Sequence, residues 1–75
     1  MAKVPTGLSG RNVRTALERA DFVFVRQRGS HMILRRGSPP AWVVVPDHRQ
    51  LKPGTLRGII ADADLTVDEF IALLK

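Results

Sequence analysis

Residues 22–46, FVFVRQRGSHMILRRGSPPAWVVVP, limit the fold most strongly, because three β-rich runs follow one another with turn signals between them. Gly29-Ser30 is typical of a two-residue hairpin turn, and the GSPP segment at residues 37–40 predicts a second turn since prolines interrupt a strand ladder. The three runs are rich in β-branched and aromatic residues, which favour strands. This stretch therefore predicts a three-stranded antiparallel meander, with strands at residues 22–28, 31–36 and 41–46.

Helical patterns flank the meander on both sides. Apolar residues at helical spacing predict a helix over residues 9–20, with Ser9 as its N-cap and Leu8 packing against Val13. After a loop at residues 47–54, a second helix is expected at 55–63. A third helix should start at Thr66, where Thr66 and Glu69 form a capping box and Leu65 can pack against Phe70.

The expected order is thus α-β-β-β-α(-α), an α+β fold of two layers with the helices on one face of a three-stranded antiparallel sheet. A chain of 75 residues fits one domain, spanning residues 1–75. It contains no cysteine, has no membrane-length apolar run and begins without the hydrophobic centre of a secretory signal. These features favour a cytoplasmic protein that does not enter a membrane.

A two-residue turn would place Arg28 opposite His31, and alternation would assign every second residue to the same side of the sheet. One face would then carry Phe22, Phe24, Arg26, Arg28, His31, Ile33 and Arg35. The other would carry Val23, Val25, Gln27, Met32 and Leu34. Both faces are apolar away from the hairpin, so the alternation leaves open which face the helices cover. An uncovered face would suit a partner, and Trp42 could belong to it.

The hairpin end of the first face combines His31 with Arg26 and Arg28. Neighbouring positive charges favour the neutral imidazole, which can accept a proton, and arginines bind phosphate. This combination suits attack by an RNA 2′-hydroxyl on its own phosphodiester, a reaction that needs no metal. The alternative from spacing alone is that His31 is simply a polar residue at the end of a strand.

Charge is distributed unevenly along the chain. Residues 1–57 carry +8 and residues 58–75 carry −3, which gives the net charge of +5. A basic body with an acidic tail indicates a polyanionic partner such as RNA, although ordinary solvated surface charge would give the same count.

Several segments together resemble the HicA (YcfA-like) family of small toxins: ALERADFVFVRQRGSHMIL, then VVVPDH, then LKPGTLRGIIADADLTVDEF. The resemblance extends from about Ser9 to Leu74. It implies a fold similar to double-stranded RNA-binding domains and the activity of an mRNA interferase, an endoribonuclease toxin of a type II toxin–antitoxin pair. It also implies mRNA as substrate and a HicB-type antitoxin as partner, with a higher-order toxin–antitoxin complex as an option. The catalytic histidine of the family falls on His31, after Gly29 and Ser30.

Two positions depart from the family pattern, because Asp21 and Asp64 stand where glycine is usual at the ends of helices. A left-handed conformation is common there, and aspartate tolerates it less well than glycine. We therefore predict a positive φ angle at both aspartates.

Other side chains are candidates for supporting roles. Ser30 and Lys52 are expected to contact RNA or its phosphates along with Arg26 and Arg28, and Lys52 lies near a helix start whose N–H groups can bind phosphate. Capping by Thr55 is a compatible structural explanation for that segment. His48 could serve as an auxiliary acid or base, or it could be an ordinary loop histidine. Neither a metal nor a cofactor is expected, since two histidines and Asp47 lack the spacing of a zinc site.

Two other functional classes remain open from the sequence. One is a non-catalytic RNA-binding module with the same basic face and a double-stranded-RNA-binding-like fold. The other is a structural partner protein that uses an apolar sheet face for association.

Overall fold

The computed structural model describes residues 3–75, and its elements follow the predicted order. They are α1 (Gly10–Glu18), β1 (Val23–Arg28), β2 (His31–Gly37), β3 (Pro40–Pro46), α2 (Pro53–Asp62) and α3 (Val67–Leu73). The strands form one sheet in the order β1-β2-β3, and both neighbouring pairs are antiparallel. The α+β prediction and the meander are therefore confirmed, and the architecture is that of a double-stranded-RNA-binding-domain-like fold.

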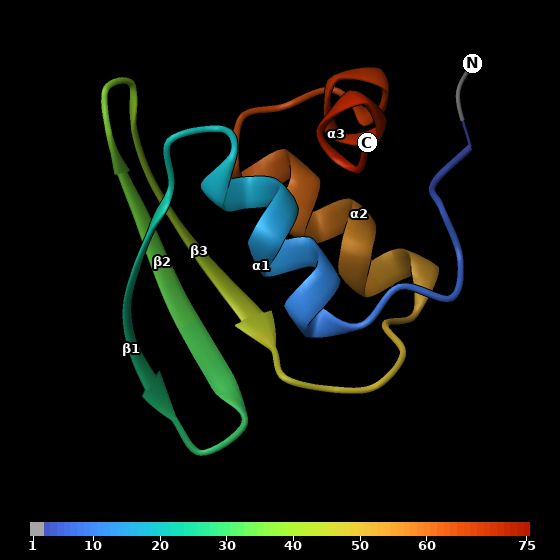
Figure 1. Cartoon of the computed structure of the whole chain (residues 1–75), viewed down its shortest axis with the longest axis horizontal. Coiled ribbons are helices and arrows are strands. Elements are labelled where there is room, and N and C mark those ends of the chain that lie inside the picture. Colours follow the sequence, from blue (N-terminus) through green and yellow to red (C-terminus); the bar gives the residue numbers. More distant parts are fainter. Residues whose placement is uncertain (1–2) are drawn as a thin grey trace.

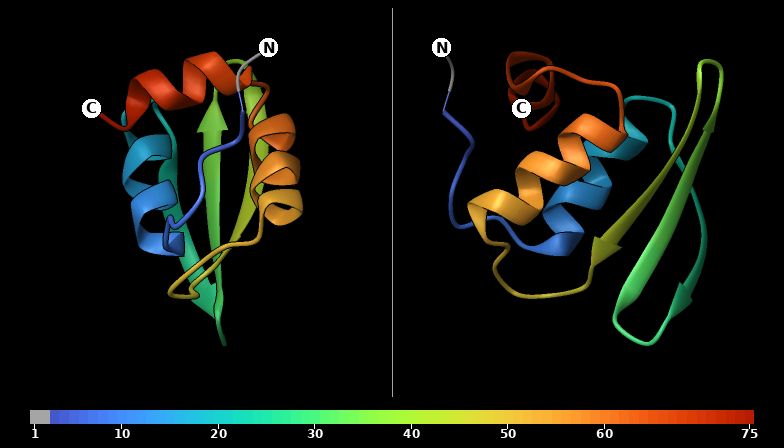
Figure 2. Two further views of the ribbon diagram at one scale, coloured as in Figure 1. Left: turned by 90° about the vertical axis from the view of Figure 1, so that its right-hand side faces the viewer. Right: turned by 180° about the vertical axis from the view of Figure 1, so that it is seen from behind.

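The helices form a layer on one side of the sheet (Figure 1). Helices α1 and α2 lie over the sheet, and α3 crosses them at the end away from the β1–β2 hairpin (Figure 2). The core between the two layers comes from the three helices, from β2 and β3 and from flanking segments, and β1 adds only the half-buried Phe24. Its fully buried large side chains are Val13, Leu17, Met32, Leu34, Val43, Val45, Leu56 and Phe70.

The β2 and β3 strands alternate as their sequences predict. Met32 and Leu34 in β2, with Val43 and Val45 in β3, point into the core, so this is the covered face of the sheet. Residues that alternate with them along the strands, such as His31 and Trp42, are exposed on the opposite face. We call that opposite side the open face. The question of which face the helices cover is thus answered by Met32 and Leu34.

The face assignment was wrong for the first half of β1, because this strand contains a bulge. Phe24 pairs with Leu34 and Arg26 pairs with Ile33, which leaves Val25 without a partner between them. An extra residue reverses the alternation. Phe22 is accordingly buried and Phe24 half-buried on the covered face, and Val23 lies on the open face. Arg26 and Arg28, beyond the bulge, share the open face with His31 as predicted.

Both helix-end aspartates adopt the predicted left-handed conformation. The φ angle is 71° at Asp21 and 60° at Asp64. The main chain turns there into β1 and into the segment before α3, respectively. These two predictions, derived from the family pattern, are confirmed.

Two of the three helices begin after the N-cap residue that the sequence predicts. Ser9 caps α1 by accepting from the Asn12 N–H, and Thr66 and Glu69 form the predicted capping box of α3. Helix α2, however, starts at Pro53, earlier than predicted, since proline is favoured at the first helical position. Its N-cap is Lys52, which makes no side-chain capping bond, so Thr55 is not the cap.

Arg36 is the one charged side chain that is buried among residues 3–75. Its guanidinium donates to the carbonyl oxygens of Pro39 (2.9 Å) and Ala63 (3.1 Å) and lies over the Phe22 ring. Ala63 is the C-cap of α2, where a positive charge is favourable. Arg36 therefore joins the sheet to α2 and belongs to the structural framework.

Arg19 plays a similar role for α3. Its guanidinium donates to the carbonyl oxygens of Leu73 (2.7 Å) and Lys75 (2.9 Å) at the end of that helix.

Within residues 3–75, no helix combines the length and apolar character that crossing a membrane requires.

Candidate functional site

The open face consists of three cross-strand rows, each with one residue from every strand. At the hairpin end, His31 lies between Arg28 and Pro46. In the next row, Ile33 lies between Arg26 and Val44. In the third row, Arg35 lies between Val23 and Trp42.

The predicted catalytic and phosphate-binding groups of the hairpin therefore come together. Arg28 is the direct cross-strand partner of His31, and Arg26 is two residues from Arg28 on the same face. All three side chains are exposed, so a ligand in solution can reach them. Because antiparallel partners have Cβ atoms about 5 Å apart, one phosphate group can contact both Arg28 and His31. Ser30, also exposed, occupies the turn that joins the two strands.

The turn before His31 is held by both of its carbonyl groups. The side-chain amide of Gln27 donates to the carbonyl oxygen of Gly29 (3.0 Å). The backbone N–H of Asp47 donates to the carbonyl oxygen of Ser30 (2.6 Å). Gly29 itself adopts a φ of 58°, which glycine permits without steric cost. The position of His31 is thus fixed by contacts from β1 and from the end of β3.

Asp47 connects this turn to α1. Its carboxylate accepts from the Gln27 amide (3.3 Å) and from the Arg11 guanidinium (3.3 and 3.5 Å). The hydrogen bond from Arg11 lowers the pKa of the Asp47 carboxyl, and the bond from Gln27 lowers this pKa further. The carboxylate is consequently charged at neutral pH and complements the basic hairpin end.

The start of α1 lies directly against the end of β3. A Cβ atom on Gly10 would collide with the carbonyl oxygen of Pro46, so only glycine fits at this contact. The Gly10 N–H also donates to the carbonyl oxygen of His48 (2.9 Å). This close approach places Arg11 beside Asp47 and brings a further arginine to the hairpin end.

The remaining predicted residues, His48 and Lys52, lie together around a different hollow. This hollow has a volume of about 250 Å³ and lies between the end of β3 and the start of α2. Its lining is formed by Pro46, His48, Gln50, Leu51, Lys52 and Thr55. Pro46 also pairs with His31 in the sheet, so this hollow adjoins the hairpin row. His48 and Lys52 are therefore grouped with each other, with Pro46 between them and His31.

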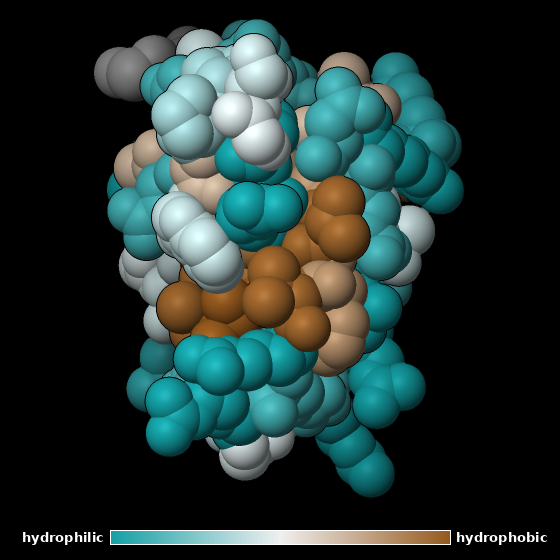
Figure 3. All heavy atoms as spheres, turned by 90° about the vertical axis from the view of Figure 1, so that its left-hand side faces the viewer, coloured by the Kyte–Doolittle hydropathy of each residue, from teal (hydrophilic) through white to brown (hydrophobic). Residues whose placement is uncertain are grey.

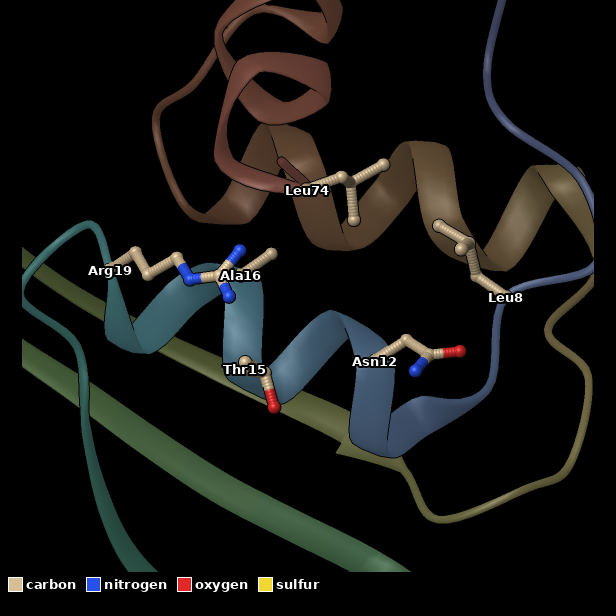
Figure 4. A pocket seen from close by; sticks show the side chains of 6 residues that line it. All are labelled: Leu8, Asn12, Thr15, Ala16, Arg19 and Leu74. Atoms are coloured by element: carbon tan, nitrogen blue, oxygen red, sulfur yellow. The ribbon is translucent and has the colours of Figure 1, made fainter.

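Two other features of the surface bear on possible ligands. Residues 3–75 contain no group of three His, Cys, Asp or Glu side chains that could hold a metal ion. A hollow of about 330 Å³ lies on the helix side, between α1 and the end of α3 (Figure 4). The side chains around it are Leu8, Asn12, Thr15, Ala16, Arg19 and Leu74. None of these can exchange a proton near neutral pH, and Arg19 is bound to the end of α3, so this hollow lacks catalytic groups.

The open face also exposes a hydrophobic patch, formed by Val23, Ile33, Trp42 and Val44 in the two rows away from the hairpin, with Val25 at the bulge. Val23 is 64% exposed and Trp42 is 60% exposed. Figure 3 shows this side of the molecule, with a hydrophobic band across its middle and hydrophilic side chains above and below it. The patch and the hairpin residues thus share one surface.

Arg11, Gln27 and Asp47 also contribute to the site, and these three residues were not predicted from the sequence. Gln27 was expected on the face opposite His31, and that placement is correct, but its bond to the Gly29 carbonyl reaches around the turn. The Arg11–Asp47 ion pair joins residues far apart in the sequence, and no local spacing indicates it. Only the position of Asp47, immediately after the strand end at Pro46, could have suggested a contact with the neighbouring turn.

Comparison with known proteins identifies one family. The model of a family described as the HicA toxin of bacterial toxin–antitoxin matches residues 10–65, from the start of α1 to the segment before α3. None of the curated proteins compared with this chain is similar enough to count as a match. The family match includes the whole sheet, the Gly-Ser-His turn and α2, which is more than half of the sequence. The chain belongs to the HicA toxin family of bacterial toxin–antitoxin systems.

Proposed function

We propose that this toxin is an endoribonuclease, an mRNA interferase that cleaves RNA by metal-independent acid–base chemistry centred on His31. One observation supports the proposal most directly: Arg28 and His31 are cross-strand partners on an exposed surface, and Arg26 is in the adjacent row. A proton carrier beside two cations can supply a general base and the charge stabilisation that phosphodiester transfer uses. The expected partners are mRNA and a HicB-type antitoxin, and the expected location is the cytoplasm.

The proposed reaction uses the nucleophile of the substrate. The imidazole of His31 accepts the proton of the ribose 2′-hydroxyl as the 2′-oxygen attacks the adjacent phosphorus. The bond from phosphorus to the 5′-oxygen breaks, and this oxygen receives a proton from an acid or from water. Arg26 and Arg28 stabilise the negative charge that grows on the phosphoryl oxygens. The products are a 2′,3′-cyclic phosphate and a 5′-hydroxyl end.

The supporting roles follow from the placement of the other residues. Lys52 and His48 line the hollow beyond Pro46, where they can contact the RNA backbone as it leaves the hairpin end. His48 is an auxiliary acid or base only if the substrate bridges this hollow and the His31 row. Ser30 can donate its hydroxyl to a phosphate at the turn.

The chemistry of the RNA ends tests the proposal. Purified protein should cleave a single-stranded RNA in the presence of EDTA, and mass spectrometry should find 2′,3′-cyclic phosphate or its hydrolysis product. The same sequence with 2′-O-methyl riboses should resist cleavage, because its nucleophile is blocked. Cleavage that stops with EDTA, or equal cleavage of the methylated RNA, would contradict the mechanism. Binding of RNA with no cleavage of any substrate would instead favour the non-catalytic RNA-binding module.

The phosphate-binding role of Lys52 has a separate test. Affinity for RNA should fall steeply as salt rises, with each phosphate contact adding about 0.7 to the slope of log K against log[salt] for single strands. Lys52→Ala should reduce that slope by about one contact and leave sequence preference unchanged. The exposed Lys75→Ala, at the opposite end of the molecule, serves as a control of equal charge. An unchanged slope for Lys52→Ala would remove this residue from the RNA-binding surface.

A further inference from the structure

The hollow between the end of β3 and the start of α2 adjoins the row of His31 and extends away from it. Pro46 belongs to both, because it pairs with His31 in the sheet and also lines the hollow. Neighbouring strands lie about 4.8 Å apart, so the hollow begins close to any phosphate group held at His31. A second hollow of about 460 Å³ adjoins the first and shares Gln50, Leu51 and Lys52 with it. Together the two hollows lead away from the hairpin end along the start of α2.

The first hollow combines an apolar floor with a polar rim. Leu51 is buried and Pro46 is half-buried, whereas His48, Gln50 and Thr55 are exposed. Apolar walls with a few polar groups are usual in sites that recognise small organic ligands. The volume of about 250 Å³ lies just below the range of about 300–1,000 Å³ that is usual for drug-sized ligands. The hollow therefore suits a group the size of one ring system.

The loop that carries these side chains is held in place by backbone hydrogen bonds from the segment before and at the start of α1. The Gly10 N–H donates to the carbonyl oxygen of His48 (2.9 Å). The Leu51 N–H donates to the carbonyl oxygen of Leu8 (2.8 Å). Figure 1 shows this loop passing the start of α1 on its way from β3 to α2. The shape of the hollow is thus set by the fold, and a ligand does not have to order the loop.

The charge around the hollow favours an anionic ligand. Residues 48–57 contain three basic side chains and no Asp or Glu. Directly before them, the carboxylate of Asp47 is already bonded to the guanidinium of Arg11. A nucleotide combines the two required properties, because its phosphate is anionic and its base is a flat ring whose edge carries hydrogen-bonding groups.

Another hollow near the hairpin lacks this relation to His31. It has a volume of about 290 Å³ and lies between α1 and β1. Gln27 and Met32 line it from the covered face, so the sheet lies between this hollow and His31. Both arginines in its lining are paired with carboxylates. A nucleotide bound at His31 therefore extends more directly into the hollow beyond Pro46.

We propose that the hollow beyond Pro46 binds the nucleobase of the nucleotide next to the scissile phosphate and thereby sets the sequence preference of cleavage. This inference rests on the proposed endoribonuclease activity, which places that phosphate at His31. The apolar floor and the ring of His48 contact the flat surface of the base. The Gln50 amide, which can both donate and accept, hydrogen-bonds to its edge. The substrate is single-stranded at this nucleotide, because a paired base cannot present its edge to the hollow.

Binding of uncleavable RNA tests the base site independently of catalysis. The probes are short 2′-O-methyl homo-oligomers of A, C and U, and a backbone of equal length without bases, followed by fluorescence anisotropy. Wild-type toxin should bind at least one of the three about tenfold or more tighter than the backbone, as expected for one stacked base. Gln50→Ala and Thr55→Val should reduce the differences in affinity among the three bases.

Arg49→Ala is the matched control, because Arg49 is exposed in the same loop but does not line the hollow. A contact to phosphate carries no sequence information, so this variant should change the affinity for every oligomer by a common factor. Circular dichroism establishes that each variant is folded.

Mapping of cleavage sites connects the hollow to the reaction. On RNA of randomised sequence, wild-type toxin should prefer particular bases beside the broken bond, which sequencing of the 5′-hydroxyl ends identifies. Gln50→Ala should reduce that preference by about tenfold or more, and Arg49→Ala should keep it. His48→Phe keeps an aromatic ring and should retain more of the preference than His48→Ala, which separates stacking from proton transfer.

Two results would overturn the inference while leaving the proposed reaction standing. One is a folded Gln50→Ala, Thr55→Val double variant that cleaves RNA with the wild-type base preference. The other is wild-type toxin that cleaves RNA but binds the oligomers no more tightly than the backbone without bases. Base discrimination that depends on Gln50, in a toxin that cleaves no RNA, would instead support base binding in the hollow and contradict the proposed reaction.

Discussion

The two faces of the sheet differ in what their side chains do. On the covered face, Met32, Leu34, Val43 and Val45 are fully buried and hold the helices in place. On the open face, the alternating residues of the same strands are His31, Ile33 and Arg35 in β2 and Trp42 and Val44 in β3, and all except the half-buried Ile33 are exposed. A single strand therefore contributes core residues from one side and exposed basic and apolar side chains from the other. It follows that substitutions at neighbouring positions should affect different properties.

The largest expected effect is on folding, from a pair of neighbouring residues in β2. Leu34→Ala should cost about 2–5 kcal/mol of the free energy of unfolding, because it leaves a cavity in a fully packed core. Ile33→Ala, on the half-buried open face, should cost clearly less. Urea denaturation followed by circular dichroism measures both. Equal losses for the two variants would contradict the division of roles between the faces.

A smaller effect is expected where the chain turns into the sheet and into α3. Asp21→Gly and Asp64→Gly should each raise the free energy of unfolding by up to about 1 kcal/mol, because glycine adopts a positive φ without steric cost. Ala61→Gly, at an exposed position inside α2, should instead lower it by about 1 kcal/mol. Chemical denaturation of the three variants provides the comparison. Destabilisation by glycine at both aspartates would show that their side chains contribute more than their conformation costs.

Acid should weaken the link between the hairpin and α1. The pKa of Asp47 is lower in the folded protein than its ordinary value of about 3.9, first through the bond from Arg11 and also through Gln27. A lowered pKa contributes stability above the ordinary value, and this stability is lost as the pH falls through the folded-state pKa. The difference in stability between wild type and Asp47→Asn should therefore shrink below about pH 3.9.

Denaturation midpoints of both proteins at pH 6 and near pH 2.5 measure this change. Glu69, whose pKa is also lowered by its bonds to Thr66, provides the comparison in α3, far from the hairpin. Asp47→Asn should in addition speed amide exchange at the turn, whereas Glu69→Gln should not. If the difference in stability between wild type and Asp47→Asn increased in acid, the proposed contribution of the Asp47 carboxylate would be contradicted.

Much of the architecture was predictable because its signals are local. The hairpin at Gly29-Ser30, the capping box at Thr66 and the alternation in β2 each depend on residues close together in the sequence. The bulge at Val25 was not predictable, since nothing in FVFVRQR distinguishes a regular strand from one with an extra residue, and register is decided by packing of Phe22 and Phe24 against the core. Helix α2 starts at Pro53 and not at residue 55, because proline is favoured at the first helical position, although the apolar spacing begins only at Leu56.

The candidate site also contains some residues whose grouping was predictable from the sequence and others whose grouping was not. Arg26, Arg28 and His31 were grouped correctly because hairpin geometry is local, and their catalytic role remains a prediction. The contacts that hold the turn could not be predicted from the sequence, because Arg11 and Asp47 meet only after α1 packs against the end of β3. His48 and Lys52 likewise lie together through the path of the loop between β3 and α2.

The central claim is that the open face carries the chemistry and contributes little to folding. His31→Ala tests it most directly, with unfolding and RNA cleavage measured on the same purified protein. We expect a change of at most about 0.5 kcal/mol in the free energy of unfolding, because the side chain is exposed. Cleavage should slow by about a hundredfold or more, because the proton carrier is lost. A folded His31→Ala protein that cleaves RNA at the wild-type rate would contradict the account.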